Sequence, residues 1–416
     1  MKVLGLVTEY NPFHNGHKYH LDLSKKITGA DFTVCVMSGN FIQRGEPALL
    51  NKWSRARMAL ENGVDLVIEL PVSYVLQSAE FFAFGAVKIL DSLNIVTHLC
   101  FGSEWGQIDE LKEIAKILIE EPEEISQKYK YYLKEGHSFV KARERAVVDY
   151  LKGSVDAQSI GHILSSPNNI LGIEYIKALY RLGSSIQPVT LKRHKAGYHS
   201  LEAYDNITSA TAIRNLLESS HYPDRIKPYM PAASFSILAN EIDMGKAPVF
   251  TQQFEQVLLT LLRKMSAAQL SNFPDVNEGL ENRIKDAVNR FGTYESVISN
   301  IKTKRYTRTR LQRIMFNVLL GITKDLLNTF QKYGGPQYIR ILGLNSKGRI
   351  LLKEAAKKAS LPIFIKPSLY RKSCNPLLRQ MMELDFLSTD LYALHYPNPR
   401  ERLGNIDITT SPIIME

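Results

Sequence analysis

Cysteine, tryptophan and long apolar runs are scarce in this sequence of 416 residues. The three cysteines, Cys35, Cys100 and Cys374, are odd in number and far apart, which excludes a disulfide framework and a zinc site. We expect them to be small buried apolar side chains in a reducing compartment. No apolar run approaches the roughly 18–20 residues of a membrane span, and the opening MKVLGLVTEY predicts a first strand instead of a signal peptide. The expected location is therefore the cytoplasm.

Acidic residues are fewer than basic residues in only one half of the chain, the C-terminal half. The net charge is +10 overall, but residues 221–416 contain 28 Lys and Arg against 17 Asp and Glu, while residues 1–220 contain 24 against 25. Such an asymmetry is typical of a polyanion-binding module joined to a near-neutral one. The length also exceeds that of one usual core, which predicts more than one domain.

Strand-like and helix-like segments alternate through the first hundred residues. The strand-like segments are continuously apolar, as in parallel strands that helices cover on both faces. The pattern therefore predicts an α/β fold with a doubly wound, Rossmann-like parallel sheet. The expected strands are 2–10, 32–39, 65–71 and 96–104, and the expected helices begin near Asn15, at 51–63 and at 78–90.

The rest of the chain is mainly helix-like, and three prolines in residues 221–231 indicate a domain boundary. We expect an α/β domain in residues 1–220 and a basic, mainly helical region with a small α/β part in residues 221–416. The further expected elements are a helical insertion in 107–182, a fifth strand at 184–193, a short helix at 209–219, helices near 248–270, 278–291 and 306–330, and a strand–helix–strand unit in 337–367.

The segment YNPFHNGH, residues 10–17, follows the first strand and precedes a helix. Turns after parallel strands are where open α/β sheets bind ligands. Gly16 allows close backbone approach, Asn15 is a suitable N-cap, and the helix N-terminus attracts phosphate. His14 and His17 can both donate to the oxygens of an α-phosphate and a leaving pyrophosphate. The pattern predicts an ATP site in an enzyme that attacks the α-phosphate, and it resembles the HxGH motif of the nucleotidyltransferase superfamily.

A second segment, TSATAIR at residues 208–214, is similar to the Ser/Thr-rich second motif of that superfamily. Hydroxyls of Ser209 or Thr211 and the N–H groups of the helix would hold phosphate oxygens. Arg214 would add charge-assisted hydrogen bonds.

Longer stretches narrow the resemblance. SGNFIQRGEPALLNKWSRA (38–56), FGSE (101–104), SPNNILGIEYIKAL (166–179) and LKRHKAGYH (191–199), with the two motifs above, resemble the bacterial tRNA(Met) cytidine acetate ligase family. The resemblance implies an enzyme that uses ATP and acetate to form acetyl-adenylate, releasing pyrophosphate. The acetyl group then passes to N4 of the wobble cytidine of elongator tRNA(Met), without acetyl-CoA. Mg²⁺ is expected to bridge the phosphates, although no carboxylate cluster identifies its ligands.

Position by position, the resemblance implies nucleotide contacts in residues 7–20, at the end of the fourth strand, in the PNN segment and at a basic pair. Either Asn168 or Asn169 could make the third of these contacts. The expected catalytic residues are His14 and His17. The expected ATP-binding residues are Val7, Thr8, Glu9, Tyr10, Asn11, Pro12, Phe13, His14, Asn15, Gly16, His17, Lys18, Tyr19, His20, Gly102, Asn169, Arg193, His194, Ser209 and Arg214.

A dense basic cluster in the C-terminal half includes Tyr306 and suits phosphate contact and base stacking. A solvated helix face is the plain alternative. The expected tRNA-binding residues are Lys302, Lys304, Arg305, Arg308, Arg310 and Arg313. The QRGEP segment, residues 43–47, is either a lid, a substrate contact or a structured loop, and the sequence assigns no step to Arg44 or Glu46.

Two other kinds of protein fit parts of this pattern. A small-molecule adenylyltransferase shares HxGH but does not need a basic half-chain. A non-catalytic tRNA-binding protein with a relic nucleotide fold would need neither histidine.

Overall fold

The five strands expected in the first half of the chain form one parallel sheet in the computed structural model. The structure describes residues 1–137, 139–151, 157–193, 206–219 and 223–416. The strands lie in the order β5-β2-β1-β6-β7, which is 3-2-1-4-5 in chain order, the arrangement of a Rossmann sheet. Their bounds are β1 (Val3–Thr8), β2 (Phe32–Ser38), β5 (Leu66–Leu70), β6 (His98–Ser103) and β7 (Gln187–Lys192). The expected fold class is confirmed.

Three short strands from the C-terminal half extend this sheet to eight strands. They are β8 (Ile339–Leu344), β9 (Ile363–Phe364) and β10 (Ile413–Ile414). β8 pairs antiparallel with β5, and both β9 and β10 pair parallel with β8. The small α/β part of the C-terminal half thus covers the edge that β5 would otherwise leave unpaired.

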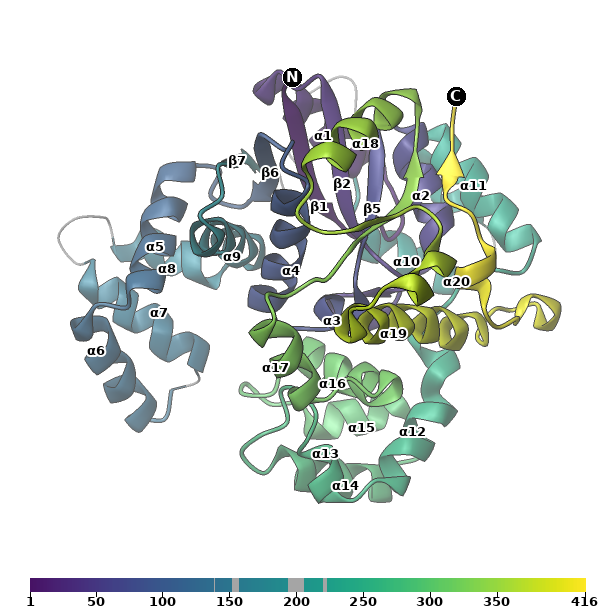
Figure 1. Cartoon of the computed structure of the whole chain (residues 1–416). Coiled ribbons are helices and arrows are strands. Elements are labelled where there is room, and N and C mark those ends of the chain that lie inside the picture. Colours follow the sequence, from purple (N-terminus) through teal and green to yellow (C-terminus); the bar gives the residue numbers. More distant parts are fainter. Residues whose placement is uncertain (138, 152–156, 194–205, 220–222) are drawn as a thin grey trace.

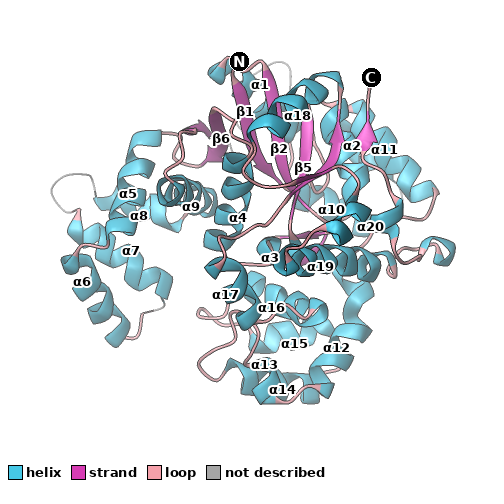
Figure 2. Ribbon diagram, viewed as in Figure 1, coloured by secondary structure: helices cyan, strands magenta, loops and turns pink. Residues whose placement is uncertain are grey.

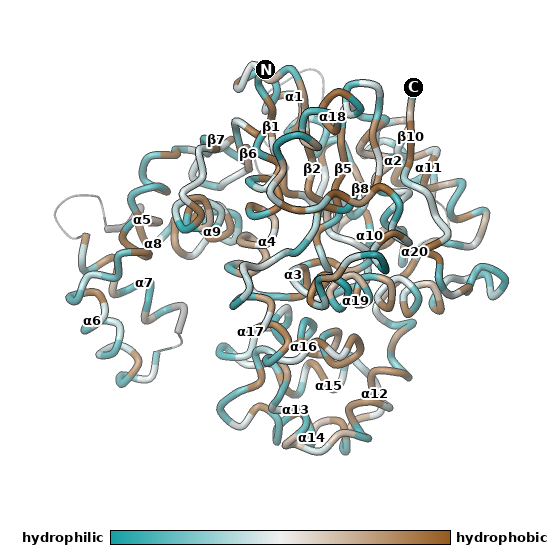
Figure 3. Tube along the Cα trace, viewed as in Figure 1, coloured by the Kyte–Doolittle hydropathy of each residue, from teal (hydrophilic) through white to brown (hydrophobic). Residues whose placement is uncertain are grey.

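Side chains of the central strands alternate between two cores. Val34 and Ile68 belong to the core on the face covered by α4 and α18, whereas Cys35 and Val67 belong to the core on the face of α1 and α2. Hydrophobic residues accordingly concentrate along β5 and β8 in Figure 3. The helices of these two faces are α1 (Asn15–Thr28), α2 (Lys52–Glu61), α4 (Ala79–Ser92), α11 (Ala232–Asp243) and α18 (Ser346–Lys358).

Two helical groups project from the sheet (Figures 1 and 2). One is the expected insertion between β6 and β7, which packs on α4 mainly through α9. It contains α5 (Ile108–Glu120), α6 (Glu123–Lys134), α7 (Phe139–Tyr150), α8 (Ala157–Ser165) and α9 (Pro167–Leu182). The other, here called the helical lobe, contains α12 (Glu255–Lys264), α13 (Ala267–Leu270), α14 (Leu280–Arg290), α15 (Tyr294–Ile301), α16 (Arg308–Leu320) and α17 (Lys324–Lys332).

The helical lobe faces the carboxyl ends of the parallel strands. A hairpin of β3 (Phe41–Ile42) and β4 (Glu46–Pro47) follows β2 and reaches α16. Phe41 packs against Phe254, Phe316 and Tyr392, with ring centroids 5.3–6.2 Å away. The core of the lobe is therefore continuous with the strand ends. Further helices lie near the boundary between the sheet and the helical lobe. They are α3 (Val72–Val75), α10 (Ala210–Ser219), α19 (Pro376–Ala393), which contacts both α3 and α16, and α20 (Ile406–Thr409) beside α19.

Two smaller expectations are tested directly. Cys35 and Cys100 are buried as expected, but Cys374 is exposed, so the expectation of three buried thiols is wrong for that residue. In the described part of the chain, no helix has both the length and the apolar character needed to cross a membrane.

Candidate active site

The turn between β1 and α1 lies where the strand order of the sheet reverses. β2 lies on one side of β1 and β6 on the other, so the connections on the two sides of β1 run in opposite directions. At such a switch point doubly wound sheets bind ligands beyond the carboxyl ends of the strands, and we call this location the crevice. The structure places His14, His17, Gly102 and Arg193 around this crevice.

His14 is the N-cap of α1, which corrects the expectation that Asn15 is. The His14 Nδ1 accepts a hydrogen bond from Gly16 N at 3.0 Å, and the His17 Nδ1 accepts one from His14 N at 3.3 Å. The Asn15 side chain instead donates to the carbonyls of Asn206 and Pro228, at 3.2 and 3.0 Å. Because each Nδ1 is an acceptor, the neutral rings carry their protons on Nε2.

The two histidine rings are stacked, with centroids 3.7 Å apart. Burial lowers the pKa of His14 to about 4, and the positive charge of Arg193 acts in the same direction. Burial also holds the pKa of His17 well below its usual range, with further contributions from His14 and Arg193, against the opposing effect of the Pro12 carbonyl. Both rings are therefore neutral hydrogen-bond donors near pH 7, and neither adds a positive charge to the crevice.

Two glycines make room for these side chains. A Cβ on Gly16 would lie 2.9 Å from the His14 ring, so a side chain there would push the ring from its capping position. A Cβ on Gly102 would lie 3.0 Å from the side chain of Arg193. Gly102 therefore lets Arg193 lie across the end of β6, near the histidines whose pKa values its charge lowers.

Asn168 and Asn169 differ in their surroundings. Asn168 donates from Nδ2 to Glu104 at 2.6 Å. Asn169 is fully buried, its Oδ1 accepts from Trp105 N at 3.0 Å, and within the described ranges its Nδ2 has no hydrogen-bond partner. An unpaired buried donor costs free energy of folding. We therefore expect the Nδ2 group of Asn169, and not that of Asn168, to donate to a ligand.

The second motif lies at the start of α10, beside the turn after β1. The Ser209 hydroxyl accepts from Ala212 N at 3.1 Å and so caps the helix. Arg214 donates to the Asn11 carbonyl at 3.0 Å and to the Thr211 hydroxyl at 3.4 Å, and it lies 3.5 Å from Glu46. The structure thus brings Arg214 to the HxGH turn, although it lies 203 positions from Asn11 in the sequence.

Other predicted residues have structural partners. Glu9 accepts from Gln43 N at 2.6 Å, and its burial raises its pKa against the opposing effect of that N–H group and nearby arginines. Lys18 forms an ion pair with Asp22 at 2.6 Å. Val7 and Thr8 end β1, Tyr10 and Phe13 pack against His17, Pro12 lies in the turn, and Tyr19 and His20 lie in α1. His194 lies outside the described residues.

Sequence reasoning missed Arg55, which holds the strand ends together. Arg55 is fully buried in α2 and donates to the carbonyls of Glu9 at 2.6 Å, Ser38 at 3.0 Å and Leu50 at 3.1 Å, and to that of Gly39. The signal was present, since an arginine lies between apolar residues on a helix expected to cover the sheet.

The basic cluster is only partly free to bind a polyanion. Arg308 pairs with Glu295 at 2.5 Å, Arg313 is largely buried beside Asp275, and Arg310 donates to the Asp275 carbonyl. Tyr306 is buried, so its expected role in base stacking is wrong. Arg305 is exposed and pairs with Glu278, whereas Lys302 and Lys304 are exposed and form no ion pair within the described part of the chain.

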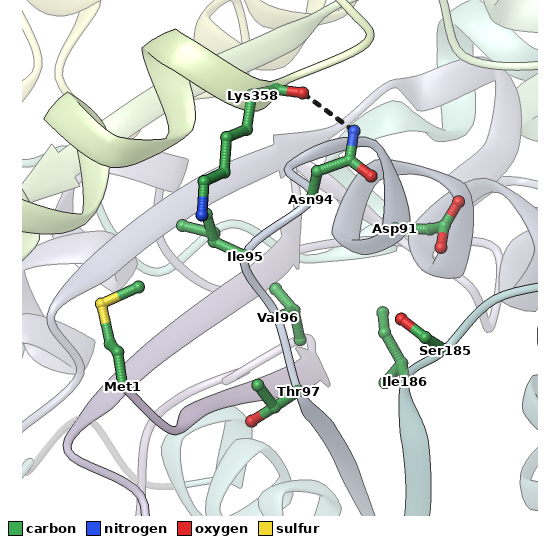
Figure 4. Close-up of a pocket in the computed structure, with 9 residues that line it drawn as sticks. All are labelled: Met1, Asp91, Asn94, Ile95, Val96, Thr97, Ser185, Ile186 and Lys358. Atoms are coloured by element: carbon green, nitrogen blue, oxygen red, sulfur yellow. Dashed lines mark hydrogen bonds between the residues drawn. The ribbon is translucent and has the colours of Figure 1, made fainter.

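Two other features lie away from these motifs. Within the described ranges, no group of three or more His, Cys, Asp or Glu side chains is arranged to hold a metal ion. A cavity of about 410 Å³ lies at the opposite end of the strands, where most of its lining residues precede β1, β6 or β7 and Lys358 ends α18 (Figure 4). It contains none of the predicted site residues and faces the amino ends of the strands.

Comparison with known proteins agrees with this geometry. Residues 1–407 match the family model described as HIGH Nucleotidyl Transferase. The Rossmann strand order and the paired histidines after β1 define the same class of protein.

Full-length relatives narrow the class. The chain is 51% identical to the tRNA(Met) cytidine acetate ligase of Acetivibrio thermocellus, with 100% of both sequences covered, and 44% identical to that of Halothermothrix orenii, with 98% of both covered. A crystal structure of Thermotoga maritima TmcAL bound with alpha-thio ATP is 39% identical, covers 100% of both chains and superposes with a TM-score of 0.94. The chain belongs to the tRNA(Met) cytidine acetate ligase family, which confirms the resemblance seen in the sequence.

Proposed function

We propose that this protein is an ATP-dependent acetate ligase that acetylates N4 of the wobble cytidine of elongator tRNA(Met). The observation that carries the proposal is the stacked pair His14 and His17 in the crevice after β1, with Arg193 and Arg214 beside it. The names of the full-length relatives support tRNA(Met) as the substrate, and the alpha-thio ATP of the Thermotoga maritima protein supports ATP as the nucleotide. The place of action that fits these substrates is the cytoplasm.

In the first step an acetate oxygen attacks the α-phosphorus of ATP, and the bond to pyrophosphate breaks. Negative charge then grows on the α-phosphate oxygens and on the leaving pyrophosphate. The Nε2–H groups of His14 and His17 stabilise this charge as preorganised neutral donors. Arg193 and Arg214 supply the positive charge that the neutral rings lack.

In the second step the N4 amine attacks the acetyl carbonyl, the bond to AMP breaks, and N4 releases a proton. The cytidine must leave its stack to reach the crevice, as bases of single-stranded RNA loops can. Lys302, Lys304 and Arg305, the exposed members of the basic cluster, would contact tRNA phosphates. Helix α16, at whose N-terminal end the cluster lies, also reaches the crevice, because Gln312 donates to Glu46 at 3.0 Å.

Mg²⁺ would enter the crevice bound to the ATP phosphates. The described residues do not supply a set of protein ligands that could hold it alone. Protein-bound Mg²⁺ usually keeps several waters and uses one or two carboxylates together with substrate phosphates. Glu9, Glu46 and Glu104 are carboxylates near the motifs in the described part of the chain. Glu9 accepts from Gln43 N, Glu46 accepts from Gln312 and faces Arg214, and Glu104 accepts from Asn168. All three are therefore already engaged, and none is assigned to the metal.

Exchange of labelled pyrophosphate into ATP tests the first step. We expect exchange that depends on acetate, and acetylcytidine in tRNA(Met) after incubation with ATP and acetate, detected by mass spectrometry of nucleosides. Exchange only with a phosphorylated cofactor precursor would identify a small-molecule adenylyltransferase, and no exchange would identify a non-catalytic tRNA-binding protein. Acetylcytidine that forms only with acetyl-CoA would contradict acetate as the donor.

A further inference from the structure

The hairpin formed by β3 and β4 carries Arg44 at its exposed tip. Gly45 closes the hairpin with φ +75°, a backbone conformation that favours glycine, and its N–H donates to the Ile42 carbonyl at 2.9 Å. A Cβ on Gly45 would lie 2.3 Å from the backbone nitrogen of Arg313 in α16. The hairpin therefore lies directly on the backbone of α16, which sets the position of its tip.

Contacts on either side of Arg44 hold the tip at the crevice. Gln43 donates its backbone N–H to Glu9 at 2.6 Å, which ties the hairpin to the residue after β1. Glu46 accepts from Gln312 at 3.0 Å and lies 3.5 Å from Arg214. Arg44 thus stands between a contact to β1 and a contact to α10.

Arg44 and Arg214 converge on one neutral hydroxyl. The Nη1 of Arg44 lies 3.5 Å from Thr211 Oγ1, and the Nη2 of Arg214 lies 3.4 Å from the same oxygen. Both distances exceed the usual N–H···O range of about 2.7–3.2 Å, so the hydroxyl satisfies neither guanidinium well. Among the residues that the structure describes, Arg44 has no ion-pair partner.

Two guanidinium groups that approach each other without a shared anion repel. Burial lowers the pKa of Arg214, the Glu46 carboxylate opposes that shift, and the positive charge of Arg44 adds to it. A further donor is available on Asn11, the residue whose carbonyl holds Arg214, because Asn11 is buried and its Nδ2 has no hydrogen-bond partner among the described residues. Guanidinium forks and an unpaired amide suit the oxygens of a phosphate chain.

We propose that Arg44 binds the terminal phosphates of ATP, the part that leaves as pyrophosphate, together with Arg214 and Thr211. The inference rests on the proposed ATP site but not on acetate or tRNA as substrates. It assigns a ligand contact to a residue of the hairpin after β2, outside both nucleotide-binding motifs of the sequence.

Binding of ATP, AMP and inorganic pyrophosphate to the full chain tests the proposal by calorimetry. We expect Arg44→Ala to weaken ATP and pyrophosphate binding about 10- to 100-fold, the scale of lost charge-assisted hydrogen bonds, and to leave AMP binding within about twofold. Arg44→Lys should recover part of the loss, because it keeps the charge without the fork. The matched control is Arg57→Ala, which removes an exposed arginine of α2 that pairs only loosely with Glu61 and should leave all three affinities unchanged.

Several outcomes would overturn the proposal. Equal losses for ATP and AMP would indicate a structural role, and unchanged ATP and pyrophosphate binding with weaker tRNA binding would place an RNA phosphate at Arg44 instead. Because neither acetate nor tRNA is present in the nucleotide titrations, a failure of acetylation alone would not change their result. A wild-type chain that binds neither ATP nor pyrophosphate would overturn this inference and the proposed function together.

Discussion

His14 and His17 each serve the protein in two ways. Their Nδ1 atoms accept backbone N–H groups at the start of α1, and in the proposed function their Nε2–H groups donate to the ligand. Burial keeps both rings neutral, since it lowers the pKa of each. A variant at position 14 therefore changes helix capping and ligand binding at once, unless the new residue preserves one of them.

His14→Ala and His14→Asn separate these two contributions. We expect both variants to lose about 10²–10³ in acetate-dependent pyrophosphate exchange, because a preorganised donor to the transition state is missing. Only His14→Ala should lower the free energy of unfolding, by about 1 kcal/mol, since Asn is a good N-cap and Ala is not. Affinity for tRNA should stay nearly unchanged in both.

A control for these variants is His162→Ala, which removes an exposed histidine of α8. Full exchange activity in His14→Asn would show that His14 acts only as a cap.

At the scale of elements, a buried ionic cluster joins the C-terminal strands to the first half of the sheet. Lys52 pairs with Glu69 at 2.7 Å and with Asp407 at 2.8 Å, and Arg340 of β8 pairs with the same two carboxylates. All four side chains are almost fully buried, so losing one would leave its partners with uncompensated charge. Asp385 of α19 lies next to this cluster and is itself buried.

Asp385 makes stability depend on pH. Burial and the charge of Glu69 raise its pKa to about 7, against about 3.9 in an unfolded chain. The folded state therefore favours the protonated form. The stability that this preference contributes is complete below about pH 4 and is lost as the pH rises through 7. Acid should thus strengthen this part of the fold, in contrast to its usual effect through ion-paired carboxylates.

Asp385→Asn tests this dependence. We expect the free energy of unfolding of the wild type, measured relative to the variant in urea, to fall by about 2–4 kcal/mol between pH 4 and pH 8. An amide cannot titrate, yet it can still accept from Val72 N and pair with the Tyr338 hydroxyl, as the aspartate does. Parallel pH profiles for the two proteins would show that Asp385 does not titrate in this range.

At the scale of the whole molecule, the helical lobe brings positive charge to the same side as the crevice. The lobe faces the carboxyl ends of the strands (Figure 1), and α16 carries the basic cluster at its start and touches the β3–β4 hairpin one turn later. A polyanion held by exposed lysines of the cluster would therefore lie near the nucleotide crevice. This placement is the structural reason to propose that one tRNA contacts both.

Lys304→Ala with Arg305→Ala tests that placement. We expect the double variant to bind tRNA(Met) about 3- to 10-fold more weakly and to reduce the slope of log affinity against log salt by about two, one for each lost phosphate contact. Pyrophosphate exchange should stay normal, because the crevice is unchanged.

The matched control is Lys353→Ala with Lys357→Ala. Like Lys304 and Arg305, this pair on α18 combines a lysine, Lys353, that forms no ion pair with any described residue and a cation, Lys357, that pairs with Glu354. Normal tRNA binding by the Lys304 and Arg305 variant would remove the cluster from the proposed interface.

The sequence by itself determined the Rossmann sheet, the HxGH turn and the family. These depend on local pattern: continuously apolar strands, a glycine between two histidines, and motifs whose residues are neighbours in the chain. The expected N-cap was wrong because propensity favours Asn15, whereas the turn geometry presents the His14 ring to the Gly16 N–H group.

Only the tertiary structure decided which distant residues meet. It showed that β8 and β10 complete the first sheet, since only pairing in space reveals that β8 covers the edge of β5. It separated the exposed cations of the basic cluster from those that neutralise Asp275 and Glu295. It also placed Arg44 beside Arg214, through a hairpin that rests on α16, a contact between segments with no shared pattern in the sequence.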